Sequence, residues 1–323
     1  MRIAVFGAGA IGGYLGAMLS LAGEEVTLVA RGPHLAAMRA RGLRLQIEGE
    51  ERVAHPRCVE DPAEAGPQDA VFLTLKAHQV PPVVDGLRAL LRAEAPVVTA
   101  QNGVPWWYFH RLEGPWEGRR LESVDPGGRI WEGIGPERAI GCVVYPATEI
   151  VEPGVIRHVE GDRFTLGEPD GSSSERVTAL AKALVGARLR APVRRNIRND
   201  LWVKLWGNVA FNPISALTRA TLDVVCTDPG TRALARGVML EAAEVAKALG
   251  EELPLDVERR IDGAARVGAH RTSMLQDIER GRPTEVDAIV GAVAELGRIA
   301  GVATPQIEML AALVRQLEAT AAR

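Results

Sequence analysis

The sequence contains little lysine. Of the 38 basic residues among 323, only Lys76, Lys182, Lys204 and Lys247 are lysines. A lysine ammonium can donate its proton near neutral pH when its surroundings lower its pKa, whereas an arginine guanidinium cannot. Lys182 and Lys247 fall on polar faces of predicted helices, so we interpret them as surface residues. Lys76 and Lys204 are the candidates for chemistry.

Cysteine is also scarce. Cys58, Cys142 and Cys226 are odd in number and far apart, which argues against a disulfide framework and a zinc site and is typical of a reducing cytoplasm. We therefore expect a cytoplasmic protein without a bound metal. The first twenty residues superficially resemble a signal peptide, but their five glycines argue against one.

Two further features are missing from the sequence. No apolar run is long enough to span a membrane. The net charge of −3 arises from interspersed arginine and acidic residues rather than from blocks, which argues against a nucleic-acid or anionic-membrane partner. The length predicts about two domains, and it leaves a monomer or a homodimer open.

The N-terminal part alternates between predicted strands and helices. Residues 2–6, 10–22 and 25–30 form a strand, a helix and a second strand, which right-handed crossover would place in a parallel sheet. Further strands are predicted at 70–75, 96–100, 139–147, 155–158, 163–166 and 188–193, with helices at 79–92 and 174–187. This alternation predicts an α/β, Rossmann-like, doubly wound sheet.

The C-terminal part has no predicted strands. After residue 195 helical patterns continue to the end, with breaks expected at Pro213, Pro229, Pro254, 281–283 and Pro305. We therefore predict an NADP-binding domain at 1–195 and an all-α substrate and catalytic domain at 196–323. The segment 105–136 is rich in Gly, Trp and Arg without a period, and we expect a long functional or packing loop there.

A glycine motif follows the first strand. Gly7, Gly9 and Gly12 spell GAGAIG with Ala8, Ala10 and Ile11 between them. In such a motif the first glycine permits a tight turn, the second lets a pyrophosphate approach the backbone, and the third lets the helix pack against the strand. The second strand is followed by Arg31 rather than by an acidic residue, and a guanidinium suits a 2′-phosphate. The pattern therefore predicts NADP rather than NAD.

Polar residues follow two later strands and recur on one helix. Lys76 and Asn102 lie at the predicted carboxyl ends of strands, where open α/β sheets bind ligands; Asn102-Gly103 is also an ordinary turn dipeptide. Lys204, Asn208 and Asn212 recur every four residues, so they share one helix face, drifting about 80° over two turns. The surrounding apolar residues predict a helix buried on much of its circumference. Its polar face is either exposed or occupied by a polar ligand.

Two more candidates lie near the C-terminus. Ser273 followed by Gln276 indicates a capping box, and Glu285 follows Pro283 in the predicted first turn of another helix. Local structure alone would account for both residues.

Together these motifs resemble one family across both predicted domains, the ketopantoate reductases (2-dehydropantoate 2-reductases). The motifs are GAGAIGG with Arg31, the strand ending at Lys76, Gln101-Asn102-Gly103, Lys204-x3-Asn208-x3-Asn212-Pro213, and SMLQDIERGRPTEVD. The resemblance implies an NADP-dependent oxidoreductase acting on a CH-OH group, which reduces 2-dehydropantoate to pantoate in pantothenate biosynthesis. It implies that Lys204 is the general acid, and that Glu285 supports this lysine and contacts the substrate hydroxyl.

The resemblance also assigns the remaining residues. Asn208, Asn212 and Ser273 would hold the substrate, while Lys76 and Asn102 would line the junction of nicotinamide and substrate. A cation at Lys76 would lower the pKa of Lys204, and Glu285 would oppose that shift.

Two departures from the family leave alternatives open. The segment 105–136 is longer than compact members need, and its tryptophans could line the substrate cleft. His270 stands where some members carry a substrate-binding asparagine, although a surface histidine is the simpler interpretation. The alternatives are a reductase of another 2-oxo acid and a non-catalytic NADP(H) sensor. A β-hydroxyacid dehydrogenase is disfavoured, because the glycine-rich substrate loop of that type is missing.

Overall fold

The computed structural model describes residues 1–253 and 256–321, and its chain divides into two compact units. The first unit contains Met1–Gln101, Pro105–Arg120 and Gly127–Ile197. The second contains Asn102–Val104, Leu121–Pro126 and Arg198–Arg323. The main division falls two residues after the predicted 195/196 boundary, and two short segments of the N-terminal half belong to the helical unit.

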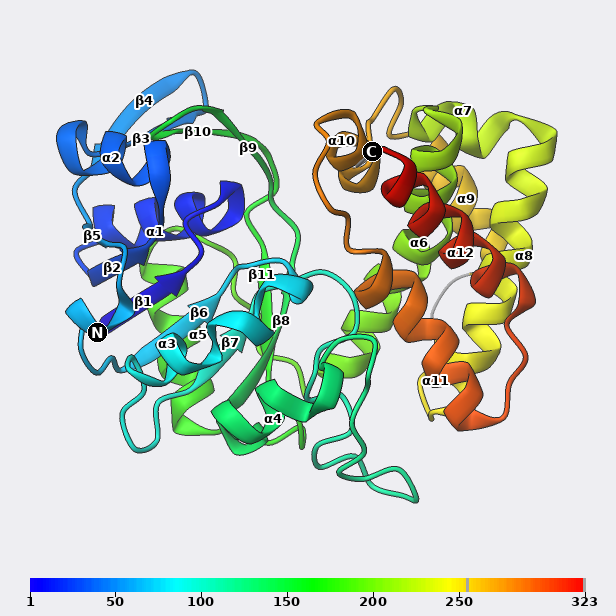
Figure 1. The fold of residues 1–323 in the computed structure, drawn as a ribbon, viewed down its shortest axis with the longest axis horizontal. Coiled ribbons are helices and arrows are strands. Elements are labelled where there is room, and N and C mark those ends of the chain that lie inside the picture. The colour runs from blue at the N-terminus through cyan, green and yellow to red at the C-terminus, as the bar shows by residue number, and fades with distance from the viewer. Residues whose placement is uncertain (254–255, 322–323) are drawn as a thin grey trace. The chain divides into compact units, whose positions relative to one another are not determined.

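A seven-stranded sheet forms the centre of the first unit, with strand order β11-β8-β7-β6-β1-β2-β5 (Figure 1). All neighbouring strands pair in parallel except β11, which runs antiparallel to β8. The strands are β1 (Arg2–Phe6), β2 (Glu25–Val29), β5 (Arg57–Val59), β6 (Ala70–Leu73), β7 (Val97–Thr99), β8 (Ala139–Val144) and β11 (Phe164–Gly167). Their side chains are largely buried, as expected for a parallel sheet covered on both faces. The predicted Rossmann-like sheet is therefore confirmed.

A second, four-stranded sheet packs against helix α1 (Ala10–Leu21). Its order is β4-β3-β10-β9, with β3 (Leu43–Ile47), β4 (Glu50–Ala54), β9 (Ala147–Glu152) and β10 (Val155–Glu160). Contact is so close that a Cβ on Gly13 would lie 2.8 Å from the Ile156 side chain. Strands β3 and β4 were not predicted, although 43–47 alternates between buried and half-buried residues and Glu48-Gly49 forms a turn with positive φ at both residues.

Several predicted elements of the first unit are wrong in extent. The helix expected at 79–92 is reduced to short 3₁₀ turns and α3 (Val84–Arg88), because Pro81 and Pro82 have no N–H to donate. The strand expected at 188–193 is reduced to two isolated bridges, at Arg190 and Val193 on either side of Pro192. The strand expected at 139–147 is divided between β8 and β9, which belong to different sheets. Helix α2 (Gly32–Arg41) was not predicted, whereas α5 (Glu175–Gly186) was.

The tryptophan-rich segment is mainly packing structure. Trp106 and Trp107 are 3% and 0% exposed, and the Trp107 indole N–H donates to the Thr99 hydroxyl at 2.8 Å. Trp131 lies in a short helix, α4 (Arg129–Ile134), and its ring meets Trp106 edge-on. The expectation of a loop is therefore wrong at α4, whereas the burial of Trp106 and Trp107 agrees with a packing role for the segment.

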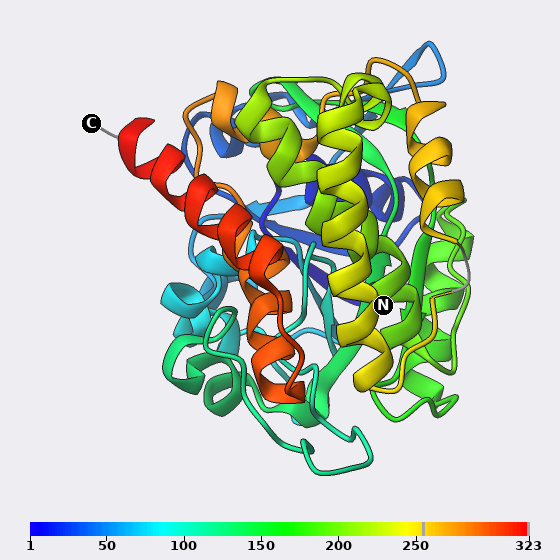
Figure 2. The same cartoon turned by 90° about the vertical axis from the view of Figure 1, so that its right-hand side faces the viewer.

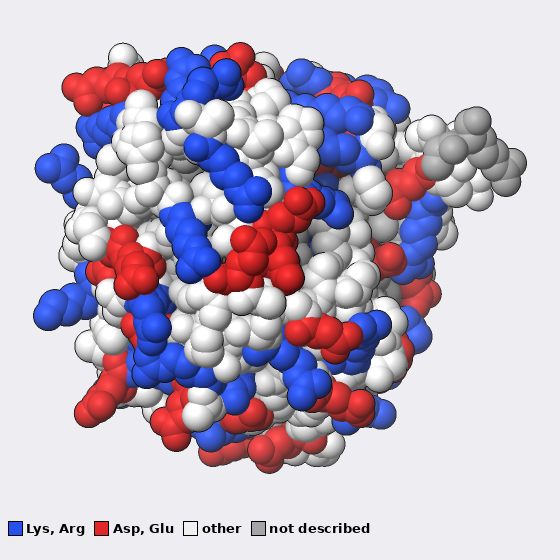
Figure 3. Space-filling view, turned by 60° about the vertical axis from the view of Figure 1, so that its left-hand side comes forward, with Lys and Arg blue, Asp and Glu red and all other residues white. Residues whose placement is uncertain are grey.

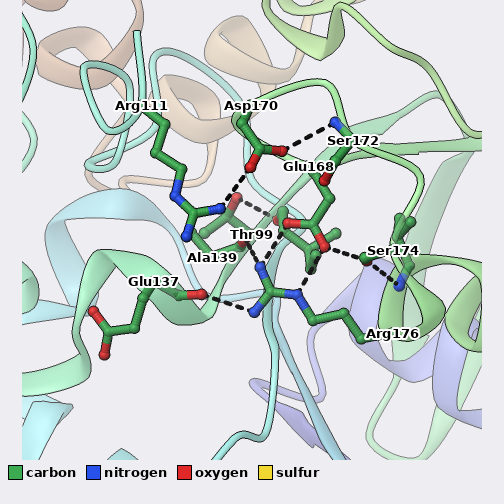
Figure 4. A network of polar contacts seen from close by, with 11 residues as sticks. Thr99, Arg111, Glu137, Ala139, Glu168, Asp170, Ser172, Ser174 and Arg176 are labelled. Carbon is green, nitrogen blue, oxygen red and sulfur yellow. Dashed lines mark hydrogen bonds and ion pairs between the residues drawn. The ribbon is translucent and has the colours of Figure 1, made fainter.

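A buried carboxylate ties the segment after β11 to α5 and β8 (Figure 4). Glu168 is 2% exposed and accepts two hydrogen bonds from Arg176, at 2.7 Å and 2.6 Å. Arg176 also donates to the Glu137 carbonyl at 2.7 Å, and Ser174 donates to Glu168 while capping α5. This end of the sheet is opposite to the carboxyl ends of β1, β6 and β7, so we assign the cluster a structural role.

Among its described residues, the second unit has helices and their connections but no strands. They are α6 (Ile197–Thr218), α7 (Leu222–Thr227), α8 (Pro229–Ala248), α9 (Val257–Ala265), α10 (Ser273–Glu279), a π-helical turn (Asp287–Gly291), α11 (Ala292–Ala300) and α12 (Pro305–Ala321). Helix α8 contacts α7, α9, α11 and α12, and Figure 2 looks onto these helices. The predicted all-α part is confirmed.

The expected breaks in the helical unit had different outcomes. Pro213 lies inside α6 rather than ending it, so this prediction is wrong. Pro229 and Pro305 are the first residues of α8 and α12, where the missing N–H costs nothing. Residues 281–283 form a connection, and Pro254 lies outside the described residues. Helix α6 is buried over most of its circumference, as predicted.

The surface carries charges of both signs. Figure 3 shows basic and acidic side chains interspersed on the face that it draws. Ion pairs between exposed or half-exposed side chains include Arg44–Glu51 and Arg129–Asp85. Lys182 and Lys247 are exposed, as predicted, whereas Lys76 and Lys204 are half-buried. Within the described ranges, no helix has both the length and the apolar character that crossing a membrane requires.

Candidate active site

The glycine motif forms a tight turn between β1 and α1. Gly7 has φ +106°, and its carbonyl accepts a hydrogen bond from the Thr74 hydroxyl at 2.7 Å. A Cβ on Gly12 would lie 2.1 Å from the same carbonyl, so a larger residue would push the helix off the turn. A Cβ on Gly9, in contrast, would meet nothing within 4 Å. The backbone at Gly9 is therefore open to a ligand.

The helices that follow β1 and β2 both begin without a side-chain cap among the described residues. Neither α1 nor α2 has an acidic residue in its first turn. Uncapped amides and the positive end of the helix dipole suit an anion. Arg31, exposed at the N-cap of α2, adds a full positive charge without forming an ion pair within the described part of the chain. These residues fit a dinucleotide with a pyrophosphate at α1 and a phosphorylated ribose at Arg31.

His34 was not among the residues predicted from the sequence. Its Nδ1 accepts from the Gly154 backbone N–H at 3.0 Å, which links α2 to the turn between β9 and β10. Burial lowers the pKa of His34 below its ordinary value. The imidazole therefore joins α2 to the small sheet. A lone histidine in a helix gave no sequence signal for this contact.

Lys76 lies where the sequence predicted, just beyond the carboxyl end of β6 in the first unit. It begins a 3₁₀ turn (Ala77–Gln79), and its backbone N–H donates to the Gln79 side chain at 3.2 Å. Beside it, the Gln101 side chain donates to the Leu75 carbonyl at 2.5 Å. Gln101 is thus anchored next to Lys76.

Three of the predicted residues meet in the second unit. The Lys204 ammonium donates to Oδ1 of Asn102 at 2.8 Å, and Nδ2 of Asn102 donates to Oε2 of Glu285 at 3.1 Å. Asn102 therefore joins an ammonium to a carboxylate through its amide, and all three side chains are half-buried. Glu285 immediately precedes the helical residues that begin at Val286, where its carbonyl accepts from Ile289 at 3.0 Å. The positive end of that helix stabilises the carboxylate.

The remaining predicted substrate residues are placed differently from one another. Asn212 is 7% exposed and Asn208 is half-buried, both on α6 with Lys204. Ser273 is exposed, and Thr272 rather than Ser273 caps α10 by accepting from Leu275. The predicted capping box is therefore wrong by one residue. His270 is exposed, and its carbonyl accepts from Leu222.

Among the described residues, no group of His, Cys, Asp and Glu side chains could hold a metal ion, and the three cysteines form no disulfide. Lys204, Asn102 and Glu285 supply an ammonium, an amide and a carboxylate in series, which can hold and deliver one proton.

Comparison with known proteins assigns the chain to a family. Residues 3–114 match the family model for ketopantoate reductase PanE/ApbA, and residues 196–318 match the model for its C-terminal domain. The chain belongs to the ketopantoate reductase family. A 2-dehydropantoate 2-reductase of Mesorhizobium japonicum is 58% identical over 318 residues, covering 98% of both chains.

Solved structures of ketopantoate reductase type share the whole fold. One from Ralstonia solanacearum has a TM-score of 0.94 at 43% identity, covering 99% of this chain and 98% of its own. A 2-dehydropantoate 2-reductase from Geobacter metallireducens has a TM-score of 0.85 at 29% identity, covering 98% and 99%. The family resemblance drawn from the motifs is confirmed.

Proposed function

We propose that this ketopantoate reductase reduces 2-dehydropantoate to pantoate with NADPH, and that Lys204 is its general acid. The family and the 58% identical relative support the reaction. The observation that carries the assignment of Lys204 is the hydrogen-bonded series Lys204–Asn102–Glu285. An ammonium held in this way stabilises and protonates an oxygen on which negative charge grows.

Different residues of the chain bind the cofactor and donate the proton. NADPH, when bound, supplies the hydride that reduces the 2-oxo carbon. Gly7, Gly9 and Gly12 shape the turn that would hold the pyrophosphate, and Arg31 would bind the 2′-phosphate. Lys204 would donate a proton to the carbonyl oxygen. Lys76, beyond the carboxyl end of β6, would line the reactive end of the cofactor.

The substrate is held by side chains of the helical unit. Asn208, Asn212 and Ser273 supply hydrogen-bonding groups for a hydroxylated 2-oxo acid. Asn212 supports this role through its place on α6, two turns after Lys204 on the same helix face and 7% exposed.

Replacing Lys204 tests the assignment of the proton donor. We expect Lys204→Ala to lower the turnover of 2-dehydropantoate by about 10²- to 10⁴-fold, the usual contribution of general acid catalysis. NADPH binding should be nearly unchanged, because the glycine turn and Arg31 are untouched. Turnover is measured by the loss of NADPH absorbance, and binding by NADPH fluorescence.

The chain offers a matched control in Lys247, an exposed lysine on α8. Lys247→Ala should retain wild-type turnover. Near wild-type turnover of Lys204→Ala would refute the role of this lysine. A higher kcat/KM for another 2-oxo acid in a substrate panel would overturn the assignment of 2-dehydropantoate as the substrate. NADPH binding without any turnover would favour a non-catalytic NADP(H) sensor.

The cofactor preference is tested separately. We expect NADPH to bind more tightly than NADH. Arg31→Ala should weaken the binding of NADPH by about tenfold and leave the binding of NADH nearly unchanged, since a charge-assisted hydrogen bond to phosphate is lost. Arg41→Ala, an exposed arginine at the end of the same helix, is the control. A lower dissociation constant for NADH than for NADPH would contradict the prediction.

A further inference from the structure

The loop that carries Asn102 is fixed by backbone contacts to the helical unit. The Val104 N–H donates to the Ala288 carbonyl at 2.8 Å. Gly103, between Val104 and Asn102, has φ +86°, and a Cβ there would lie 2.3 Å from the Ala288 oxygen and 2.6 Å from its carbon. Only glycine combines this backbone conformation with so close an approach.

The Ala288 carbonyl belongs to the π-helical turn Asp287–Gly291. In a regular α-helix the amide of Ala292 would donate to Ala288, four residues back. Here the amide of Ala292 donates to Asp287, five residues back. The wider turn thus directs the Ala292 amide away from Ala288, whose carbonyl receives the loop instead. π-Turns of this kind are uncommon and cluster at functional sites.

The same helix start also carries Glu285, and its position is set by two neighbours. The Thr284 hydroxyl accepts from the Val286 N–H at 3.1 Å, and the Thr284 N–H donates to Glu318 of α12 at 2.5 Å. One rigid segment therefore holds Glu285 by its own backbone and Asn102 through Gly103 and Val104. The amide of Asn102 is brought between Lys204 and Glu285 by this docking.

From this geometry we infer that the π-turn and Gly103 are a positioning device, which holds the Asn102 amide in line between Lys204 and Glu285. Gly103 is a positioning residue that acts through Asn102. The inference rests on the proposed function for its kinetic consequence, but its structural part does not depend on the substrate.

Substitution of Gly103 tests whether this residue positions Asn102. We expect Gly103→Ala to lower kcat by about ten- to a hundredfold, since small misplacements of catalytic groups have effects of this size. The dissociation constant of NADPH should stay within about twofold, because the cofactor turn is elsewhere in the chain. Gly301→Ala is the matched control: Gly301 has φ +73° and ends α11, but a Cβ there meets nothing within 4 Å. It should lose some thermal stability through backbone strain alone and keep its turnover.

A double-mutant cycle separates positioning from general loosening. If Gly103 acts through Asn102, Gly103→Ala should have little further effect on kcat in an Asn102→Ala background. Additive effects, or a Gly103→Ala variant with wild-type kcat, would overturn the inference. A wild-type protein that does not turn over 2-dehydropantoate would instead overturn the proposed function.

Hydrogen exchange on the wild-type protein provides a test that needs no variant. The Val104 amide should exchange as slowly as the core amides of α11, because its partner is a buried helix carbonyl. Exchange at the rate of an open loop would show that the loop is not docked and would refute the device, even if Gly103→Ala failed to fold.

Discussion

At the scale of the residue, His34 makes stability depend on pH. Its folded-state pKa is lowered by burial from the ordinary 6.5, so the unfolded chain binds a proton at higher pH than the folded chain does. The stabilisation is therefore fully present above about pH 6.5 and is lost as pH falls through the folded pKa. Protonation would also remove the acceptor for the Gly154 N–H.

We expect the unfolding free energy to fall between about pH 7 and pH 5, in the range where histidine titrates. Titration of one proton changes the unfolding free energy by at most about 1.4 kcal/mol per pH unit, and screening by water at a half-buried site reduces this change. Urea unfolding should show a smaller pH dependence for His34→Asn, which keeps an acceptor near Nδ1. His270→Asn, at an exposed histidine, is the control; an unchanged pH dependence in His34→Asn would contradict the prediction.

The candidate site shows which residue-level features a sequence can reveal. Gly7, Gly12 and Arg31 follow a local pattern whose geometry depends only on near neighbours. Asn102 forms hydrogen bonds with Lys204 and Glu285, which lie 102 and 183 positions further along the chain. Its bridging position therefore depends on the tertiary fold. Motif resemblance named all three members of the series, but the order Lys204–Asn102–Glu285 came from the structure.

At the scale of the element, the segment from Pro105 contributes to stability through buried aromatics. Trp107→Phe should destabilise the protein by about 1–3 kcal/mol, because the Thr99 hydroxyl loses a donor inside the core. Urea unfolding measures the loss. Trp116→Phe, at a partly exposed tryptophan, should have a smaller effect, and equal losses in the two variants would show that the Trp107 hydrogen bond contributes little.

Proline explains most of the errors at the element scale. The sequence correctly predicted breaks in the helical pattern at Pro229 and Pro305. Each of these prolines is the first residue of the helix that follows the break. Pro213 stays inside α6, whose burial on most sides compensates for one missing hydrogen bond. Packing, which the local sequence does not contain, decides between these outcomes.

At the scale of the whole molecule, the sequence predicted the parallel sheet and the helical part because both have strong periodicity. It missed the small sheet as a separate layer, since the β3–β4 and β9–β10 pairs are joined only by the pairing of β3 with β10, across about a hundred residues of sequence. The 195/196 boundary stays a prediction, close to the observed division after Ile197.

The division into units has a consequence for recombination between relatives. Asn102–Val104 and Leu121–Pro126 belong with the helical unit although they are encoded far upstream of it. A single crossover at 197/198 would transfer Lys204, Glu285 and the π-turn from one parent, and would leave Asn102 and Gly103 from the other. Chimeras made by one exchange therefore take Asn102 from one parent and Lys204 and Glu285 from the other, whereas an exchange that also includes 102–104 keeps the three residues together.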